Sequence, residues 1–238
     1  PEEPEAAPQK RRAIDAYGVL FDQGEKPTMS IILVDVGNAG VPMNEAATLD
    51  LPITFAVAVD RSDATLAAQS YFKNGHEVLA LSPRSVALSL SGGQSEKQVA
   101  DLLTEFFAII PQSVGLLDVP EATLQNDRVL SNHVLAALHE TGHGVVTYEQ
   151  GLNAVLREAD KAGVPAGLIY RSLDQKGESD EAIKRHLDRA AAEASRSGHV
   201  LVIGSTRAAT IDAIKSWTQS RTAQNVVLAP VSASIKEN

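Results

Sequence analysis

Eight short apolar runs, separated by helix-like segments, constrain the fold of this 238-residue chain more than any other feature. The runs are mostly β-branched and bounded by Gly, Pro or Asp, as buried strands usually are. They cover residues 29–36, 53–59, 77–81, 114–117, 144–148, 166–170, 200–203 and 225–228. Helices between strands make βαβ units, and these place the strands in a parallel sheet. We therefore predict an α/β protein with one (β/α) barrel of seven to eight parallel strands; a doubly wound open sheet is the alternative.

The helical patterns that alternate with these runs carry recognisable start and stop signals. Ser95 and Gln98 have the spacing of a capping box, and Gly75, Gly163 and Gly198 stand where helices should end. The predicted helices span 64–73, 95–107, 127–140, 152–161, 179–197 and 208–220. Residues 13–21 are predicted to be an extended lead-in, and 82–97 contains a long irregular loop. No internal domain boundary is visible, so 13–238 is predicted to be a single domain.

The chain begins "PEEPEAAPQKRR", a composition rich in Pro, Glu and Ala that cannot bury a core. Residues 1–12 are therefore predicted to be a disordered linker. Such a linker suggests tethering to something upstream, for example a membrane anchor, although a frayed terminus would look the same. The remainder has no apolar run of about 18 residues that could span a bilayer.

Composition excludes several kinds of function. A net charge of −9 argues against nucleic-acid binding, which needs a basic face. The absence of cysteine removes disulfides, thiolate nucleophiles and Cys-based zinc sites. Neither a dinucleotide-binding or P-loop glycine motif nor a Gly-x-Ser-x-Gly elbow occurs in the expected context. We interpret the six histidines as structural, because their predicted positions do not converge at strand ends.

Polar residues follow most of the predicted strands, and in parallel barrels the site lies at those carboxyl ends. This predicted rim comprises Asp35, Asn38, Asp60, Arg61, Ser82, Arg84, Asp118, Glu121, Tyr148, Glu149, Arg171, Asp174, Ser205 and Arg207. Such a mixture of acids, amides and arginines suits sugar hydroxyls, amides and carboxylates. Polar residues also stand at strand ends simply because loops are wet. The ligand-binding candidates are Asp35, Asn38, Asp118, Glu121, Tyr148, Arg171 and Arg207.

The layout resembles the divergent polysaccharide deacetylase family, a branch of the NodB-like carbohydrate deacetylases. The likeness runs from about Met29 to Val231. It rests on "MSIILVDVG", "LPITFAVAV", "NGHEVLALSP", "PQSVGLLDVPE", "IKRHLDRAAAEASRSGHVLVIGSTRAATIDAIKSW" and "VVLAPVSA". The resemblance implies a distorted (β/α) barrel. It also implies hydrolysis of N-acetyl groups on a polysaccharide by a metal held by one Asp and two His, with a second Asp as base.

Several motif positions depart from the family pattern. Val34 and Asp35 replace its Asp-Asp pair, so only a vestigial metal-binding acid remains. Leu117, Asp118 and Val119 replace Asn-Asn-His, Ser205 replaces the late His, and Leu81 stands where a His is frequent. Zinc needs about three nitrogen, sulfur or carboxylate ligands. We therefore predict no metal cofactor and no confident catalytic residue; the alternative is a divalent metal held by Asp35, Asp118 and Glu121.

Three functions follow, and the first is preferred. The chain would be a non-catalytic glycan- or protein-binding scaffold of the cell envelope, periplasmic and tethered through its linker. Its partner would be an envelope glycan or envelope protein. Alternatively it is a metal-dependent N-deacetylase with unusual carboxylate ligands. A third hypothesis is a glycoside-cleaving enzyme that uses Asp118, Glu121 or Glu149 as acid and base.

Overall fold

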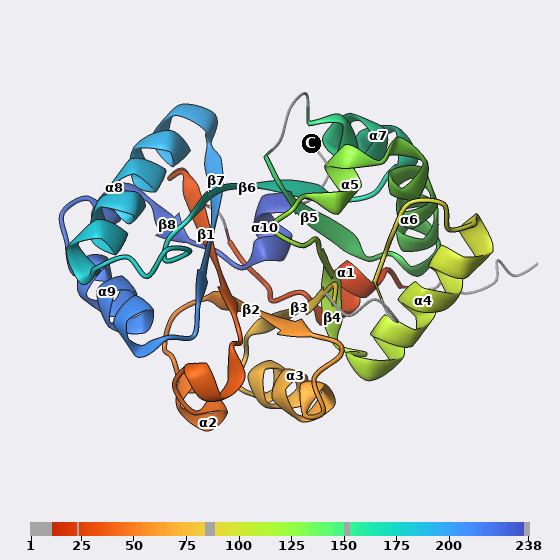
Figure 1. Cartoon of the computed structure of the whole chain (residues 1–238). Coiled ribbons are helices and arrows are strands. Elements are labelled where there is room, and N and C mark those ends of the chain that lie inside the picture. The colour runs from red at the N-terminus through yellow and green to blue at the C-terminus, as the bar shows by residue number, and fades with distance from the viewer. Residues whose placement is uncertain (1–10, 23, 84–88, 150–152, 236–238) are drawn as a thin grey trace, which may run out of the picture.

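The computed structural model describes residues 11–22, 24–83, 89–149 and 153–235, and within them eight parallel strands form one α/β domain (Figure 1). The strands are β1 Thr28–Val34, β2 Ile53–Ala58, β3 Glu77–Leu81, β4 Ser113–Leu117, β5 Gly144–Tyr148, β6 Ala166–Ser172, β7 His199–Ser205 and β8 Val227–Leu228. All eight predicted strands are therefore present, with ends that shift by no more than two residues. Residues 1–10 of the predicted linker, together with Arg84, lie outside the described part.

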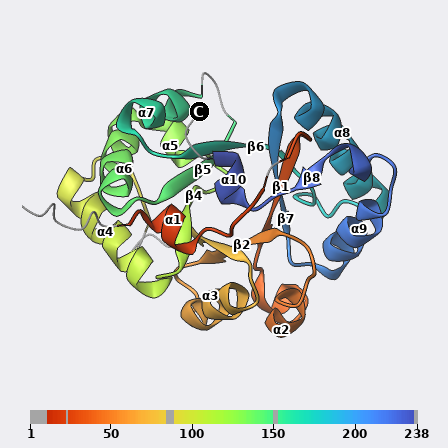
Figure 2. The ribbon, with the colours of Figure 1, turned by 180° about the vertical axis from the view of Figure 1, so that it is seen from behind.

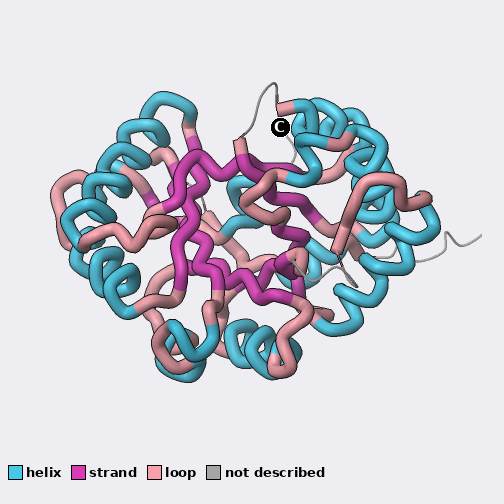
Figure 3. The backbone as a smooth tube through the Cα atoms, in the orientation of Figure 1, coloured by secondary structure: helices cyan, strands magenta, loops and turns pink. Residues whose placement is uncertain are grey.

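Seven of the strands close into a barrel, which rules out the open-sheet alternative. Strands β1 to β7 pair in chain order, and β1 then pairs with both β7 and β2. The ring of strands is visible in Figure 3. The last strand, β8, pairs with Thr28 and Met29 at the start of β1, whereas β2 pairs with Ile31 to Val34. The barrel is distorted because β1 contacts two different strands along its length on this side.

Helices surround the barrel in the described residues. They are α1 Ala13–Tyr17, α2 Met43–Ala46, α3 Ala64–Lys73, α4 Glu96–Ile109, α5 Thr123–Asn126, α6 Arg128–Thr141, α7 Ala154–Ala162, α8 Asp180–Ser197, α9 Ala208–Thr218 and α10 Val231–Ile235, with 3₁₀ turns η1 Gly37–Ala39 and η2 Ala223–Asn225. The six helices predicted from the sequence pattern are present as α3, α4, α6, α7, α8 and α9, and the short α1, α2, α5 and α10 were not predicted. The capping box predicted at Ser95 is present, because its hydroxyl accepts from Gln98 N and the Gln98 side chain accepts from Ser95 N. Gly163 and Gly198 end α7 and α8 in the left-handed conformation that glycine adopts without strain.

The amino ends of the strands are closed by α1 and α10, the first and last helices of the described residues. The prediction of an extended lead-in over 13–21 is wrong at its start, because residues 13–17 form α1. The Ile14 side chain is fully buried in the barrel interior, together with Val231 and Ile235 of α10. Seen from behind in Figure 2, α1 and α10 lie over this end of the barrel. A five-residue amphipathic turn is too short to give a periodic signal, and packing against the barrel stabilises it instead.

A buried carboxylate holds this closed end together. Glu77, at the start of β3, is fully buried and accepts hydrogen bonds from Val19 N at 2.9 Å and from Ser232 N at 2.9 Å, and also from the Ser232 hydroxyl. It therefore ties the lead-in and α10 to the same strand. Since this end is packed and bonded, the open end for a ligand is the opposite one, at the carboxyl ends of the strands.

Candidate functional site

Asp35, the first residue after β1, is buried at the carboxyl end of the barrel, and donors surround its side chain. Its Oδ1 lies 2.7 Å from Nη1 of Arg61 and accepts from Gly37 N at 2.8 Å. Its Oδ2 accepts from the Tyr71 hydroxyl at 2.8 Å. Both carboxylate oxygens are thus engaged within the protein.

Arg61 supplies the positive charge at this position. It follows β2, and its side chain is 20% exposed. It pairs with Asp35 on one side and makes two hydrogen bonds of 2.9 and 2.8 Å to Asp63 on the other. Burial disfavours the charged guanidinium, but its hydrogen bonds to Asp63 and Asp35 outweigh burial and raise the Arg61 pKa. The arginine therefore stays cationic at neutral pH and provides the positive charge that pairs with Asp35.

Tyr71 closes the other side of Asp35 from within the core. The residue is on α3, is fully buried, and stacks on Phe55 with ring centroids 3.8 Å apart and an interplanar angle of 6°. Burial, followed by the charge of Asp35, raises the pKa of the Tyr71 hydroxyl, so it remains a hydrogen-bond donor. The Tyr71 hydroxyl is therefore held in place by the packing of its ring in the core and by its position on a helix.

Asp118, directly after β4, is buried in a different environment. Its Oδ1 accepts from Val119 N at 2.8 Å, and its Oδ2 accepts from Leu124 N at 3.1 Å and from the Thr147 hydroxyl at 2.9 Å. These neutral donors do not offset desolvation, so burial raises the Asp118 pKa. The carboxylate fixes the β4–α5 turn to β5, and its oxygens are used for that purpose.

A third buried acid, Asp174, joins the ends of β6 and β7. Its Oδ2 accepts from Ser205 N at 3.1 Å, from the Ser205 hydroxyl, and from the Thr210 hydroxyl at 2.6 Å. The exposed Arg207 lies 3.7 Å from the same oxygen. Ser205, which stands at the family's late histidine position, therefore acts as a donor to Asp174 that connects two strands.

The open end of the barrel contains an apolar pocket, here called the mouth pocket, of about 360 Å³. It is lined by Val34, Ala58, Asp60, Leu81, Ser82, Pro83, Val119, Pro120 and Tyr148. A neighbouring pocket of about 320 Å³ shares Ser82, Pro83 and Val119 with it and extends to Glu121. Three positions at which the family resemblance implies a base or an imidazole, Val34, Leu81 and Val119, thus converge on one space that lacks their chemistry.

The structure brings some predicted candidates to the mouth and places others apart. Tyr148 lines the mouth pocket and Glu121 the neighbouring one. Asn38 is exposed in η1, and Arg207 is exposed beside Asp174. The Arg171 guanidinium lies 5.5 Å from the ring centroid of Tyr170 on β6. Binding by these residues stays a prediction.

The residues present do not fit the metal site that the family implies. Among the described residues, no group of three or more His, Cys, Asp or Glu side chains is placed to hold a metal ion. The alternative set of Asp35, Asp118 and Glu121 is thus not assembled, because the first two are engaged in separate hydrogen-bond networks. Histidine does not compensate: His76, for example, is buried near Phe55 with Nε2 3.0 Å from Ala47 O, and burial lowers its pKa.

The sequence analysis identified the buried carboxylates but missed most of the residues that bind them. Arg61 and Asp174 were in the predicted rim, but not among the candidates selected from it. Tyr71 and Thr147 were absent, because a tyrosine in a helical apolar pattern and a threonine in a strand look like ordinary core residues. The available signal was the adjacency of β1 and β2, which places Asp35 and Arg61 at neighbouring strand ends.

The sequence profile described as divergent polysaccharide deacetylase matches residues 31–235, so the chain belongs to that family. A comparison with curated protein sequences gave no match. Among solved structures, an uncharacterized protein from Agrobacterium tumefaciens C58 is similar, with 20% identity, a TM-score of 0.79, and coverage of 94% of this chain and 95% of that one.

Two more distant structures share the fold. A family 4 carbohydrate esterase from Streptomyces lividans, in complex with acetate, has 11% identity and a TM-score of 0.60 over 89% of this chain and 97% of that one. A CE4 family pseudoenzyme from Bacillus anthracis has 13% identity and a TM-score of 0.53 over 90% of this chain and 66% of that one. At these identities the likeness establishes the barrel and not the activity.

Proposed function

We propose that this domain is a non-catalytic member of its family, a binding module of the cell envelope that takes an envelope glycan or envelope protein at the barrel mouth. One observation carries this proposal: the vestigial acid Asp35 is paired with Arg61 and Tyr71 instead of being free for a metal. A similar barrel from Bacillus anthracis is a CE4 family pseudoenzyme, and this precedent supports the loss of activity on this fold.

The chemistry of deacetylation explains why these substitutions matter. In the metal-dependent reaction, the ion polarises the acetyl carbonyl and lowers the pKa of its bound water from about 15.7 to about 7. Here, the guanidinium of Arg61 neutralises Asp35 but offers no open coordination position for water. Val34 has no group that could accept a proton. The residues at the mouth can therefore hold a ligand but lack the means to ionise water.

The mouth pocket suits an amphipathic ligand such as a sugar ring. Val34, Leu81 and Val119 supply an apolar floor, and Asp60, Ser82 and Tyr148 bring polar groups to its border. Pockets of this size, with apolar walls and a few polar groups, are typical ligand sites. The glycosidase hypothesis finds less support, because the carboxylate oxygens of Asp118 accept hydrogen bonds from the β4–α5 turn and Thr147.

The envelope location is part of the same proposal. It rests on the linker composition of residues 1–12 and on the nature of the family's polysaccharide substrates. Within the described residues, no helix combines the length and the apolar character needed to cross a bilayer. Expression of the natural protein with a reporter at its carboxyl terminus, followed by fractionation, tests the location; a reporter found in the cytoplasm would contradict it.

Acetate release tests the loss of catalysis. The purified domain is incubated with N-acetylglucosamine oligomers and with peptidoglycan, with and without added Zn²⁺ or Co²⁺, and free acetate is measured. No release above the buffer blank is expected. Release that disappears in Asp35→Ala would instead support the alternative of a deacetylase with unusual ligands.

Binding at the mouth is tested with a matched pair of aspartate variants in the loops that flank one strand. Asp50 precedes β2 and Asp60 follows it, and both are exposed. Asp60→Asn and Tyr148→Ala should weaken retention on peptidoglycan, or on an identified envelope protein, by about tenfold, whereas Asp50→Asn should not change it. Equal effects of Asp60→Asn and Asp50→Asn would place the binding site elsewhere.

A further inference from the structure

The outer face of β6 differs from the outer faces of the other barrel strands. The outward-facing side chains of β1, β2 and β7, such as Leu33, Phe55 and Val202, are fully buried under helices. On β6, by contrast, the outward-facing Ala166, Leu168 and Tyr170 are only half-buried. These apolar side chains lack the cover that the rest of the barrel has.

The cover is incomplete because the two flanking helices share their packing with other elements. Helix α7 packs on both α6 and β6, and α8 packs mainly on α9 and β7 and less on β6. In Figure 1, β6 crosses between α7 and α8 without a described helix over it. The space left between them is a groove of about 470 Å³, here called the β6 groove. Its lining includes Glu149, Leu156, Arg157, Asp160, Ala166, Leu168, Tyr170, Glu193, His199 and Ile235.

The shape of the β6 groove determines what kind of element can fill it. Strand β6 is hydrogen-bonded to β5 on one side and to β7 on the other, so it has no free edge for an added strand. Only side chains face the groove. The element that packs on a parallel sheet between two helices is another helix, which buries an apolar stripe against the sheet.

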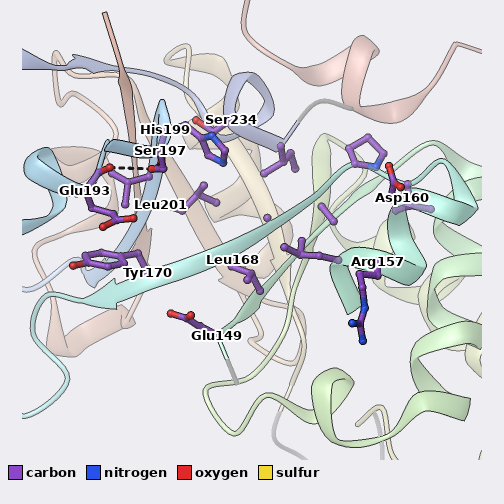
Figure 4. Close-up of a pocket in the computed structure, with 17 residues that line it drawn as sticks. Glu149, Arg157, Asp160, Leu168, Tyr170, Glu193, Ser197, His199, Leu201 and Ser234 are labelled. Carbon is purple, nitrogen blue, oxygen red and sulfur yellow. Dashed lines mark hydrogen bonds between the residues drawn. The ribbon is translucent and has the colours of Figure 1, made fainter. Parts of the chain in front are cut away.

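The charges around the groove select among possible helices. Figure 4 places Leu168 on the strand, Glu193 near Tyr170 on one wall, and Arg157 and Asp160 on the other. Glu149, Asp160 and Glu193 are acidic, and Arg157 is the one arginine or lysine that lines the groove among the described residues. Glu193 also pairs with Arg196 of its own helix. Because Glu193 is paired and Arg157 offsets one further acid, the border carries a small excess of negative charge around an apolar floor.

We propose that the β6 groove docks an amphipathic helix from a partner protein, with an apolar stripe against Ala166, Leu168 and Tyr170 and with Lys or Arg beside the stripe. About three turns of helix, or about 11 residues, are slightly longer than the nine-residue α7 that forms one wall. A second copy of this chain is a poor occupant, because each copy has a net charge of −9 and the groove border is itself acidic. This site is separate from the barrel mouth and is independent of the function proposed there.

The test uses two model peptides on the ¹⁵N-labelled domain. One is a helix of about 14 residues made of Leu and Lys, with Leu at helical spacing; the other replaces every Lys with Glu. Amide chemical shifts are recorded during titration. The Leu/Lys peptide should bind saturably and shift the amides of β6, α7 and α8, and the Leu/Glu peptide should bind at least tenfold more weakly.

Variants decide whether the groove itself is responsible. Leu168→Glu on the groove floor should weaken the Leu/Lys peptide at least tenfold, and the matched Leu66→Glu, on the exposed face of α3, should leave binding unchanged. Because Leu168→Glu could disturb the barrel, the double variant Glu149→Lys with Asp160→Lys, at exposed positions, provides a second test and should weaken binding similarly.

Three results would overturn the proposal. The first is shifts that map to the mouth or to other faces, and the second is equal weakening by Leu66→Glu and Leu168→Glu. The third is concentration-dependent dimerisation, with β6 amides shifting when no peptide is present, which would make a second copy the occupant. None of these results affects the glycan and acetate measurements at the mouth, so the two proposals can fail separately.

Discussion

Asp35 and Asp118 are both buried carboxylates that directly follow a barrel strand, yet they differ in whether their hydrogen-bond donors include a charged group. Asp35 faces the cationic Arg61 and the Tyr71 hydroxyl. Asp118 receives hydrogen bonds from two backbone N–H groups and the Thr147 hydroxyl, all neutral. The first site is therefore an ion pair, at a position where the resemblance implies a metal ligand, whereas the second is a turn-stabilising acid whose pKa is raised by burial. The difference shows that a strand-end acid is informative only together with its partner.

The largest effect should come from removing the cation of the first site. Arg61→Met leaves Asp35 buried and without its counter-charge. Breaking a fully buried pair costs about 3–5 kcal/mol, and because Arg61 is partly exposed we expect a loss of about 2–3 kcal/mol in the free energy of unfolding. Chemical denaturation measures it. Arg207→Met, which removes an exposed arginine near Asp174, is the control and should cost less than about 1 kcal/mol.

A double-mutant cycle then isolates the pair. The double variant Asp35→Asn with Arg61→Met should be destabilised by less than the sum of the two single variants. The reason is that Arg61→Met alone leaves the Asp35 charge buried without its arginine, whereas the double variant has neither charge. Additive losses would mean that Asp35 and Arg61 are not coupled, and that Arg61 acts through its packing and its pair with Asp63.

Removal of the second donor at Asp35 should have an intermediate effect. Tyr71→Phe keeps the stack on Phe55 and loses only the hydroxyl that donates to Asp35. A hydrogen bond to a charged group contributes about 1.5–3 kcal/mol, and because Arg61 still neutralises Asp35 we expect a loss near 1.5 kcal/mol. Tyr170→Phe on β6 serves as the matched control; if both variants cost the same, the Tyr71 hydroxyl has no special role.

At the second site, the donor from β5 should contribute less. Thr147→Val preserves shape and removes one of three donors to Asp118, with an expected loss of about 1 kcal/mol. It should also raise the Asp118 pKa further, since one stabilising hydrogen bond to the carboxylate is gone. Thermal unfolding and carboxyl ¹³C shifts measure the two effects, and a lowered pKa would contradict the assignment.

The last prediction concerns how the free energy of unfolding changes with pH. The pKa of Asp118 in the folded protein lies above its ordinary value of 3.8, so the folded state retains the proton to higher pH than the unfolded state does. The stability contributed by the protonated form is therefore complete below 3.8 and is lost as pH rises through the folded pKa. The difference in unfolding free energy between wild type and Asp118→Asn should thus favour the wild type more at pH 3 than at pH 7. A stability advantage of the wild type over Asp118→Asn that increases with pH would contradict a raised Asp118 pKa.

The β-strand framework could be predicted because apolar β-branched runs of this length leave few alternatives. Parallel strands also bring their carboxyl ends together, so Asp35, Asp118 and Tyr148 were correctly expected near the ends of strands. The side-chain partners of these acids could not be predicted in the same way. The partners of Asp35 depend on the conformation of Arg61 after β2 and on the orientation of α3, which places Tyr71 beside Asp35. The helix α1 was missed for a related reason, because its stability comes from burying Ile14 and not from its own pattern.

The β6 groove shows the same limit at a larger scale. The sequence over 166–170 is apolar throughout, as expected for a barrel strand, and nothing in it distinguishes Leu168 from the buried Leu33. Whether a helix covers a strand depends on where α7 and α8 pack, and that is determined by contacts far along the chain. Only the assembled barrel reveals that the described helices leave part of one face open.

Isothermal titration calorimetry of Zn²⁺ into the metal-free domain tests the central claim most directly, namely that Arg61 has taken the role of a cation at Asp35. We expect no saturable binding near one ion per chain, in the wild type or in Arg61→Met, because Val34, Leu81 and Val119 offer no ligand. Stoichiometric binding by the wild type that disappears in Asp35→Ala would contradict it.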